Sequence, residues 1–128
     1  MARKKALPAL HELESEVMEA VWAHDEVSVR QVMELLNAKA SKPRAYTTYM
    51  TIMRRLDDKG LLERRREGKT DFYRPAYPRE EYAQLRAQAE VDALVDRYGD
   101  VALGHFARQI EQLDPARKRA LQRLARKG

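Results

Sequence analysis

The residues best suited to recognising another molecule lie between Ser41 and Pro75. At about 100° per residue, Thr47, Thr51 and Arg54 fall on one side of a single helix. Threonine offers a hydroxyl to a base edge or phosphate and a methyl group to thymine, while arginine can bind guanine or a phosphate through paired hydrogen bonds. Because threonine is a poor helix former, a face that only meets solvent would favour Glu, Lys or Gln. This face therefore predicts contact with nucleic acid, and the alternative is an amphipathic helix with a merely solvated polar face.

The helix that carries this face is bounded by two residues with strong backbone preferences. Pro43 disfavours the helical conformation for the residue before it, and Gly60 is a natural C-terminal stop. A helix is therefore predicted over residues 45–59, lying in a DNA major groove. Its other side should face the core, because it is formed by Tyr49, Ile52, Met53 and Leu56.

A two-stranded hairpin is predicted directly after the helix. The runs 61–66 and 70–74 read as strands, with Glu67-Gly68-Lys69 as the turn between them. Leu62, Phe72 and Arg64 alternate as one strand face would. The like charges near the tip of the hairpin repel one another, which costs free energy. Contact with DNA phosphates would neutralise this repulsion and favour binding. The alternative is a soluble hairpin whose charges protect a sheet edge.

The positive charge of the chain is concentrated in this helix and hairpin. Residues 41–74 hold 10 basic and 5 acidic residues, whereas residues 1–40 have a net charge of −2 and residues 75–128 a net charge of +2. Such a distribution is the footprint of a surface that binds a polyanion. The candidate DNA contacts are Lys42, Arg44, Tyr46, Thr47, Thr48, Met50, Thr51, Arg54, Arg55, Arg64, Arg66 and Lys69.

The residues before this stretch supply two supporting helices. Apolar residues recur at helical spacing over 10–23, and Ser28 with Gln31 has the spacing of a capping box that begins a second helix running to about residue 38. A short extended link at 26–28 precedes the second helix. The order of elements is that of a winged helix-turn-helix, in which the third helix reads the groove. We therefore expect a basic flexible arm over residues 1–8 and a DNA-binding domain over residues 9–76.

The C-terminal part reads as helices with narrow apolar stripes, predicted over 79–98, 101–113 and 116–126. Such helices cannot close a core by themselves, and the same region of a second chain is the economical partner. We therefore expect a mainly α protein with a helical dimerisation domain over residues 77–128; folding back on the winged domain is the alternative. The candidate dimer contacts are Tyr82, Leu85, Ala89, Leu94, Val95, Phe106, Ile110, Leu113, Leu121 and Leu124.

Composition excludes several other classes. The chain has no cysteine, which excludes disulfides, thiol catalysis and cysteine metal sites and fits a cytoplasmic location. No apolar run approaches the length of a membrane span, and no signal peptide is evident. His11, His24 and His105 are scattered, and neither a phosphate loop nor a zinc-protease motif appears. We therefore expect no enzymatic activity, no metal and no cofactor.

Several segments together resemble the BlaI/MecI penicillinase-repressor family over about residues 10–106. They are Leu13-Glu14, Glu16-Val17-Met18, Val21-Trp22, Val29-Arg30-Gln31-Val32, Ala45-Tyr46-Thr47-Thr48, Met50-Thr51, Arg55-Leu56, Lys59-Gly60-Leu61 and Tyr73-Arg74-Pro75. The resemblance implies a dimeric transcriptional repressor on palindromic operators, released when a membrane sensor with a metalloprotease domain triggers its proteolysis. The alternative function is a winged helix for protein contacts or non-specific nucleoid binding, without its own operator.

Two positions depart from what the resemblance implies. The family has a small β-branched residue in the reading helix where this chain has Tyr49, which we expect to point inward and to change packing against the first two helices. The family is cut at an Asn-Phe bond, and the matching residues here are His105 and Phe106. Cleavage at this bond is therefore a hypothesis, and a core role for Phe106 is the alternative.

Overall fold

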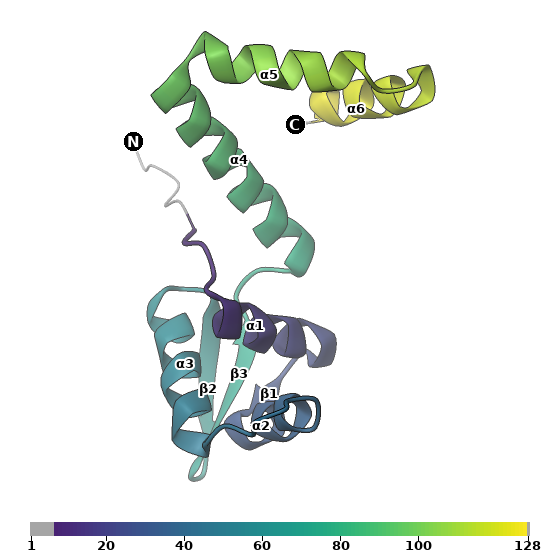
Figure 1. Ribbon diagram of the computed structural model, residues 1–128. Helices are drawn as coiled ribbons and strands as arrows, with labels where there is room; N and C mark the ends of the chain where they lie inside the picture. Colours follow the sequence, from purple (N-terminus) through teal and green to yellow (C-terminus); the bar gives the residue numbers. More distant parts are fainter. Residues whose placement is uncertain (1–6, 128) are drawn as a thin grey trace. The chain divides into compact units, whose positions relative to one another are not determined.

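The computed structural model describes residues 7–127, which form six helices and three short strands (Figure 1). Their order is α1 (Glu12–His24), β1 (Val27–Ser28), α2 (Val29–Asn37), α3 (Tyr46–Asp58), β2 (Leu62–Glu67), β3 (Thr70–Pro75), α4 (Arg79–Tyr98), α5 (Asp100–Glu111) and α6 (Pro115–Lys127). The chain divides into two compact units within α4, after Ala87. We call residues 7–87 the winged-helix unit and residues 88–127 the C-terminal unit. The predicted domain boundary after residue 76 stays a prediction.

The strands form one antiparallel sheet in the order β1-β3-β2, and β2 and β3 make the wing. The register pairs Arg64 with Tyr73 and Arg65 with Phe72. Since paired residues share a face, Phe72 lies on the opposite face from Leu62 and Arg64, so the predicted grouping of these three residues is wrong. The aromatic residue on the same face as Leu62 is Tyr73, and its ring is buried in the core.

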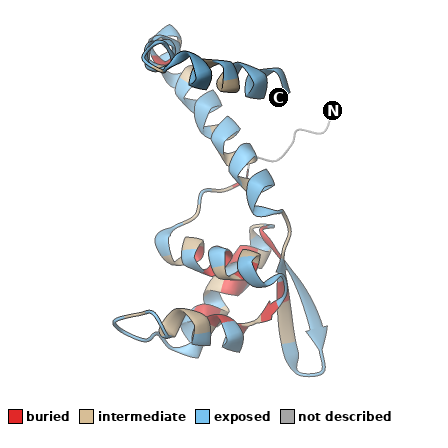
Figure 2. Ribbon diagram, turned by 90° about the vertical axis from the view of Figure 1, so that its right-hand side faces the viewer, coloured by how far each residue is buried: buried red, intermediate tan, exposed pale blue. Residues whose placement is uncertain are grey.

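The core of the winged-helix unit lies between α1, α2, α3 and the sheet (Figure 2). Its buried apolar residues are Leu7, Val17, Met18, Val21, Val27, Val29, Val32, Tyr49, Met53, Leu56, Leu61, Leu62 and Tyr73. The first residues of α4 join this unit, because Tyr82 and Leu85 pack against the core. Trp22 donates its indole N–H to the carbonyl oxygen of Tyr77 at 2.9 Å, which ties α1 to the segment before α4.

Local capping explains where the first two helices begin. The predicted box at α2 is present, because the Gln31 backbone N–H donates to the Ser28 hydroxyl at 3.2 Å and the Gln31 side chain accepts from the Ser28 N–H at 2.7 Å. At α1, Glu14 accepts from the His11 N–H at 3.0 Å. α3 ends before Gly60, whose φ of 81° is a left-handed conformation that suits glycine.

The C-terminal unit contains the end of α4 together with α5 and α6. Its only buried residue among those described is Ala102, and most of its residues are exposed (Figure 2). Asp114 caps α6 by accepting from the Arg117 N–H at 2.9 Å. No helix in the described part of the chain is long and apolar enough to cross a membrane. The predicted basic arm, residues 1–8, lies outside the described residues except for Leu7 and Pro8.

Candidate nucleic-acid interface

Helix α3 separates a buried face from an exposed polar face, as the threonine pattern predicts. Tyr49, Met53 and Leu56 are each 0% exposed. The exposed face carries the hydroxyls and guanidinium groups expected for base and phosphate contacts, and Met50 lies half-buried at its edge. The candidates of α3 that are exposed are Tyr46, Thr47, Thr48, Thr51, Arg54 and Arg55. The side chains proposed to reach DNA are therefore accessible on one face of a well-packed helix.

The turn before α3 is held by Asn37, the last residue of α2. Its side-chain amide donates to the Arg44 carbonyl oxygen at 2.9 Å, and its Oδ1 accepts from the Arg44 N–H at 3.0 Å. The same oxygen accepts from the Tyr49 hydroxyl at 2.7 Å. The inward orientation predicted for Tyr49 is confirmed. These three bonds fix the loop that carries Lys42 and Arg44, both exposed, at the start of α3.

Sequence reasoning missed Asn37, although a signal for it existed. A phenol in the apolar stripe of α3 must bury its hydroxyl, and buried tyrosine hydroxyls usually find a hydrogen-bond partner. Asn37 is an amide with both a donor and an acceptor in the turn before that helix. The need of the Tyr49 hydroxyl for a partner therefore points to Asn37.

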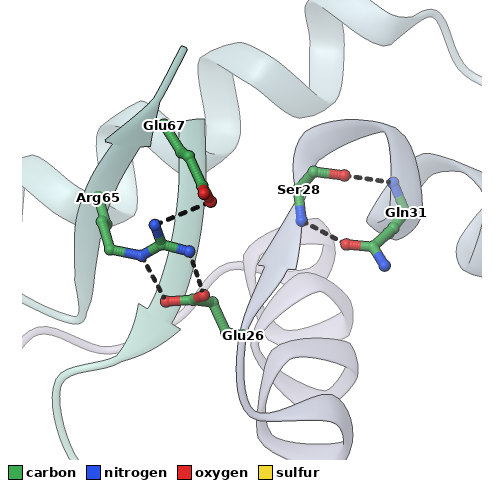
Figure 3. Close-up of polar contacts among 5 residues, drawn as sticks. All are labelled: Glu26, Ser28, Gln31, Arg65 and Glu67. Atoms are coloured by element: carbon green, nitrogen blue, oxygen red, sulfur yellow. Dashed lines mark hydrogen bonds and ion pairs between the residues drawn. The ribbon is translucent and has the colours of Figure 1, made fainter. Parts of the chain in front are cut away.

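In the wing, Arg65 is occupied by contacts within the protein (Figure 3). Its guanidinium donates to both carboxylate oxygens of Glu26, at 2.7 and 3.3 Å, and to Glu67 at 3.0 Å. The hydrogen bond from Arg65 lowers the pKa of Glu26, and the bonds to Glu26 and Glu67 raise the pKa of Arg65. Arg65 also lies 5.0 Å from the centre of the Phe72 ring. It therefore braces the wing against the link before β1.

Arg64 and Arg66 are held more loosely than Arg65. Arg64 lies 3.7 Å from Asp57 and 3.9 Å from Asp71, and Arg66 lies 3.9 Å from Asp71. The three distances are too long for hydrogen bonds, and Arg66 instead donates to the Gly68 carbonyl oxygen at 3.3 Å. Lys69 is exposed in the turn between the strands. Unlike Arg65, none of these three side chains makes a hydrogen bond to a carboxylate among the described residues.

A cleft of about 470 Å³ lies between α3, the start of α2 and the wing. It brings together five of the predicted contacts, namely Tyr46, Met50, Arg54, Arg66 and Lys69. Ser28 and Arg30, at the start of α2, also line it and were missed by sequence reasoning. The capping box was the available signal, because the N-terminus of a helix attracts anions. Thr47, Thr48, Thr51 and Arg55 do not line this cleft and lie elsewhere on the exposed face.

The predicted dimer contacts fall into two groups. Tyr82 and Leu85 pack against the core of the winged-helix unit, and the Tyr82 hydroxyl donates to the Pro8 carbonyl oxygen at 2.9 Å. In the C-terminal unit, Leu94, Ile110 and Leu124 are exposed. The remaining candidates are half-buried: Ala89, Val95, Phe106, Leu113 and Leu121. His105 is exposed, so the hypothetical cleavage bond lies inside α5 between an exposed and a half-buried residue.

A model of the penicillinase repressor family matches residues 10–127 of the chain. The transcriptional regulator BlaI of Mycobacterium tuberculosis is 37% identical over 109 residues, which cover 81% of this chain and 75% of that protein. The penicillinase repressor of Bacillus licheniformis is 28% identical over 86 residues, covering 66% of this chain and 65% of that protein. The solution structure of the DNA-binding domain of the repressor BlaI, 28% identical, gives a TM-score of 0.52 and covers 62% of this chain and 94% of that chain.

The fold agrees with these matches. α1 to α3 and the wing form the winged helix-turn-helix arrangement predicted from the order of elements, and the solved BlaI domain has the same fold. The family match extends beyond this unit through α6. Both the matched length and the identity to the mycobacterial regulator show that the chain belongs to the penicillinase repressor family.

Proposed function

We propose that this DNA-binding transcriptional repressor acts as a homodimer on a two-fold symmetric operator. The exposed face of α3 enters the major groove, and the wing reaches neighbouring phosphates. The family is one of repressors rather than enzymes, so the chain is not an enzyme. Two copies of α3 would then contact half-sites about one DNA turn, or a multiple of it, apart.

The observation that carries this proposal is the division of α3 into two faces. Tyr49, Met53 and Leu56 anchor the helix completely, while Thr47 and Thr51 point outward with no role in the core. Exposed threonines contribute little to helix stability, so their placement beside exposed arginines favours a binding role. The net positive charge of residues 41–74 supports the same face.

A selection experiment tests the proposal directly. The full chain would be incubated with a library of random duplexes at moderate salt, and the bound sequences would be determined. Specific binding survives at salt concentrations where phosphate-only binding fades. We expect an enriched site with two-fold symmetry. Binding without any enriched sequence would instead support the non-specific nucleoid module, and absence of DNA binding would support a protein-interaction module.

Substitutions of the threonines on α3 test which residues read bases. Replacing Thr47 or Thr51 by alanine should weaken binding to the enriched site by about 1–3 kcal/mol where a base contact is lost, and should relax preference at one base pair. Gln84, an exposed polar residue of α4, provides a matched control because its replacement by alanine removes no proposed contact. An unchanged base preference in both threonine variants would contradict the proposal.

Support for the homodimer comes from exposed apolar side chains in the C-terminal unit. Val101 is 65% exposed, Leu124 is 63% exposed and Ile110 is 45% exposed. Apolar surface of this kind favours burial against a partner, and a second copy is the simplest one. Sedimentation equilibrium of the full chain should give the mass of a dimer at micromolar concentration. A monomer that still binds a symmetric site with one copy per half-site would contradict this part.

Release by proteolysis is proposed for the bond between His105 and Phe106. The bond lies within α5 and follows Gly104, which lowers helix stability locally by about 1 kcal/mol relative to alanine. A protease needs an extended segment, so α5 would have to open first. The chain would be expressed together with a membrane sensor that has a metalloprotease domain, an inducer would be added, and the fragments of the chain would be mapped. Derepression with an intact chain would exclude this mode of release.

A further inference from the structure

The cleft between α2, α3 and the wing contains a carboxylate that DNA binding by itself does not explain. Four cationic side chains line the cleft, those of Arg30, Arg54, Arg66 and Lys69. Among the described residues that line it, Asp71 is the acidic one. A negative charge in this place opposes the phosphates that the cations attract.

Asp71 is neither solvated nor well bonded. Its side chain is 17% exposed, and its Oδ1 is buried without a hydrogen-bond partner among the described residues. Its two oxygens each lie 3.9 Å from an arginine, Oδ2 from Arg64 and Oδ1 from Arg66. A buried acceptor without a donor costs free energy. The carboxylate is therefore poorly placed to stabilise the wing, whereas it is well placed to attract two guanidinium groups.

The two arginines differ from Arg65 in how they are held. Arg65 makes hydrogen bonds to Glu26 and Glu67 at 2.7 to 3.3 Å. Arg64 and Arg66 have side chains that are 43% and 65% exposed, and their contacts with Asp71 are too long for hydrogen bonds. Arg66 also donates to the Gly68 carbonyl oxygen at 3.3 Å. Neither arginine loses a hydrogen bond to Asp71 when it turns to an arriving phosphate.

We infer that Asp71 is an intramolecular competitor of DNA phosphates, which occupies Arg64 and Arg66 in the free protein and weakens binding to DNA of any sequence. The inference rests on the proposed function, since it concerns the same DNA-binding face. A phosphate that binds to Arg64 and Arg66 must displace the carboxylate of Asp71 from them. The carboxylate stays nearby and repels the phosphate. Removing the carboxylate frees cationic charge for the duplex.

The test uses the full chain and a short duplex of random sequence, so that no operator is needed. Asp71→Asn removes the charge and keeps the size of the side chain. Binding at about 0.1 M salt should tighten about fivefold to tenfold, which is the gain in affinity expected for one more phosphate contact. The slope of log K against log salt should therefore steepen by about 0.9.

Glu63→Gln is the matched control. Glu63 lies on the same wing and makes a similarly long contact with Arg74, at 3.7 Å, but it does not line the cleft. The substitution removes the same charge from the same chain, so it reports the effect of net charge alone. Equal changes in affinity and salt slope for Asp71→Asn and Glu63→Gln would overturn the inference.

A double-mutant cycle identifies the mechanism. In an Arg64→Ala/Arg66→Ala background the carboxylate has lost both guanidinium partners, so Asp71→Asn should no longer steepen the salt slope. If Asp71→Asn strengthens DNA binding as much in this background as it does in the wild type, the inference is overturned. Thermal unfolding of each variant checks the fold, and Asp71→Ser serves as a second neutral variant if Asp71→Asn melts at a lower temperature. Failure of the random library to yield an enriched site would count against the proposed operator and leave these results intact.

Discussion

The two units of the chain differ sharply in how they bury apolar side chains. In the winged-helix unit, Tyr49, Met53 and Leu56 are completely buried. In the C-terminal unit, Val101 and Leu124 are 65% and 63% exposed. Both units are helical, so the difference does not come from secondary structure. It arises because the first unit has a sheet that encloses a core together with α1, α2 and α3, whereas the described part of the second unit has helices alone.

The polar contacts of the winged-helix unit also connect residues far apart in sequence. Lys59, at the end of α3, donates to the buried carboxylate of Glu14 at 2.7 Å, and Arg65 of the wing binds Glu26 before β1. Asn37 joins the end of α2 to the start of α3. The cap of α6 by Asp114 is local by comparison. The comparison suggests that the first unit is stable by itself, while the second needs a further surface.

The largest expected effect tests this contrast in apolar burial. Leu56→Ala should lower the free energy of unfolding by about 2–5 kcal/mol, because it leaves a cavity in the core. Leu124→Ala removes the same group from an exposed site and should change the unfolding of the winged-helix unit by less than about 0.5 kcal/mol. Urea unfolding of the full chain, followed through the fluorescence of Trp22, measures both.

The Leu56→Ala and Leu124→Ala variants can also contradict the difference between the two units. Fluorescence from Trp22 reports on the winged-helix unit, because its indole bonds to Tyr77 within that unit. Comparable losses for Leu56→Ala and Leu124→Ala at low protein concentration would mean that the two units unfold together. The view of an independently stable first unit would then be wrong.

The next effect concerns the turn before α3. Asn37→Ala removes three hydrogen bonds and leaves the buried Tyr49 hydroxyl without its partner, so the free energy of unfolding should fall by about 1–3 kcal/mol. Tyr49→Phe removes one of the three bonds and should cost about 1 kcal/mol. Urea unfolding measures both changes, and DNA titrations report whether Arg44 remains positioned. A larger loss for Tyr49→Phe than for Asn37→Ala would contradict the assigned role of Asn37.

Helix patterns and caps made much of the winged-helix unit predictable from sequence. Pro43 and Gly60 bounded α3, and the Ser28–Gln31 box marked the start of α2. Threonine on the outer face of α3 indicated DNA contact, because that residue type is unfavourable on a merely solvated helix. These signals are local in sequence, because each is carried by a single residue or by residues of one helix.

Contacts between distant segments were not predictable in the same way. The register of the wing decided that Tyr73 rather than Phe72 enters the core, and a shift of one residue reverses the face of a strand. The wing arginines look equivalent in sequence, yet Arg65 is committed to Glu26, which lies 39 residues earlier in the chain. Arg30 joined the cleft only because the N-terminus of α2 lies beside the wing.

A third prediction tests the exposed apolar surface of the C-terminal unit. Val101→Asp places a charge on an exposed position of α5 and should weaken self-association by about tenfold, equal to about 1.4 kcal/mol, if that surface is buried in the dimer. Sedimentation equilibrium measures the change. Gln109→Asp on the same helix, also exposed and initially polar, controls for added charge. Equal weakening by both substitutions would point to charge repulsion rather than to lost apolar contact.

The smallest effects should separate two ion pairs of equal length. The nitrogen–oxygen distance is 2.7 Å both in the Lys59–Glu14 pair and in the Arg65–Glu26 pair, but Glu14 is 1% exposed and the Glu26 side chain is 36% exposed. Burial raises the pKa of Glu14, yet the hydrogen bonds from Lys59 and the His11 N–H outweigh it and hold the pKa below its ordinary value of 4.5. The pKa of Glu26 is also lowered, through its hydrogen bond from Arg65.

Both carboxylates have a lower pKa in the folded than in the unfolded chain, so their stabilising contribution is present above the ordinary pKa of 4.5 and is lost as the pH falls through the folded value. The advantage of the wild type over Glu14→Gln in unfolding free energy should therefore shrink between about pH 6 and about pH 3. The corresponding change for Glu26→Gln should be smaller, because solvent screens an exposed pair. Urea unfolding across this range measures both. A greater acid dependence at Glu26 would mean that the Arg65–Glu26 pair, rather than the buried Lys59–Glu14 pair, contributes more to the stability of the winged-helix unit above pH 4.5.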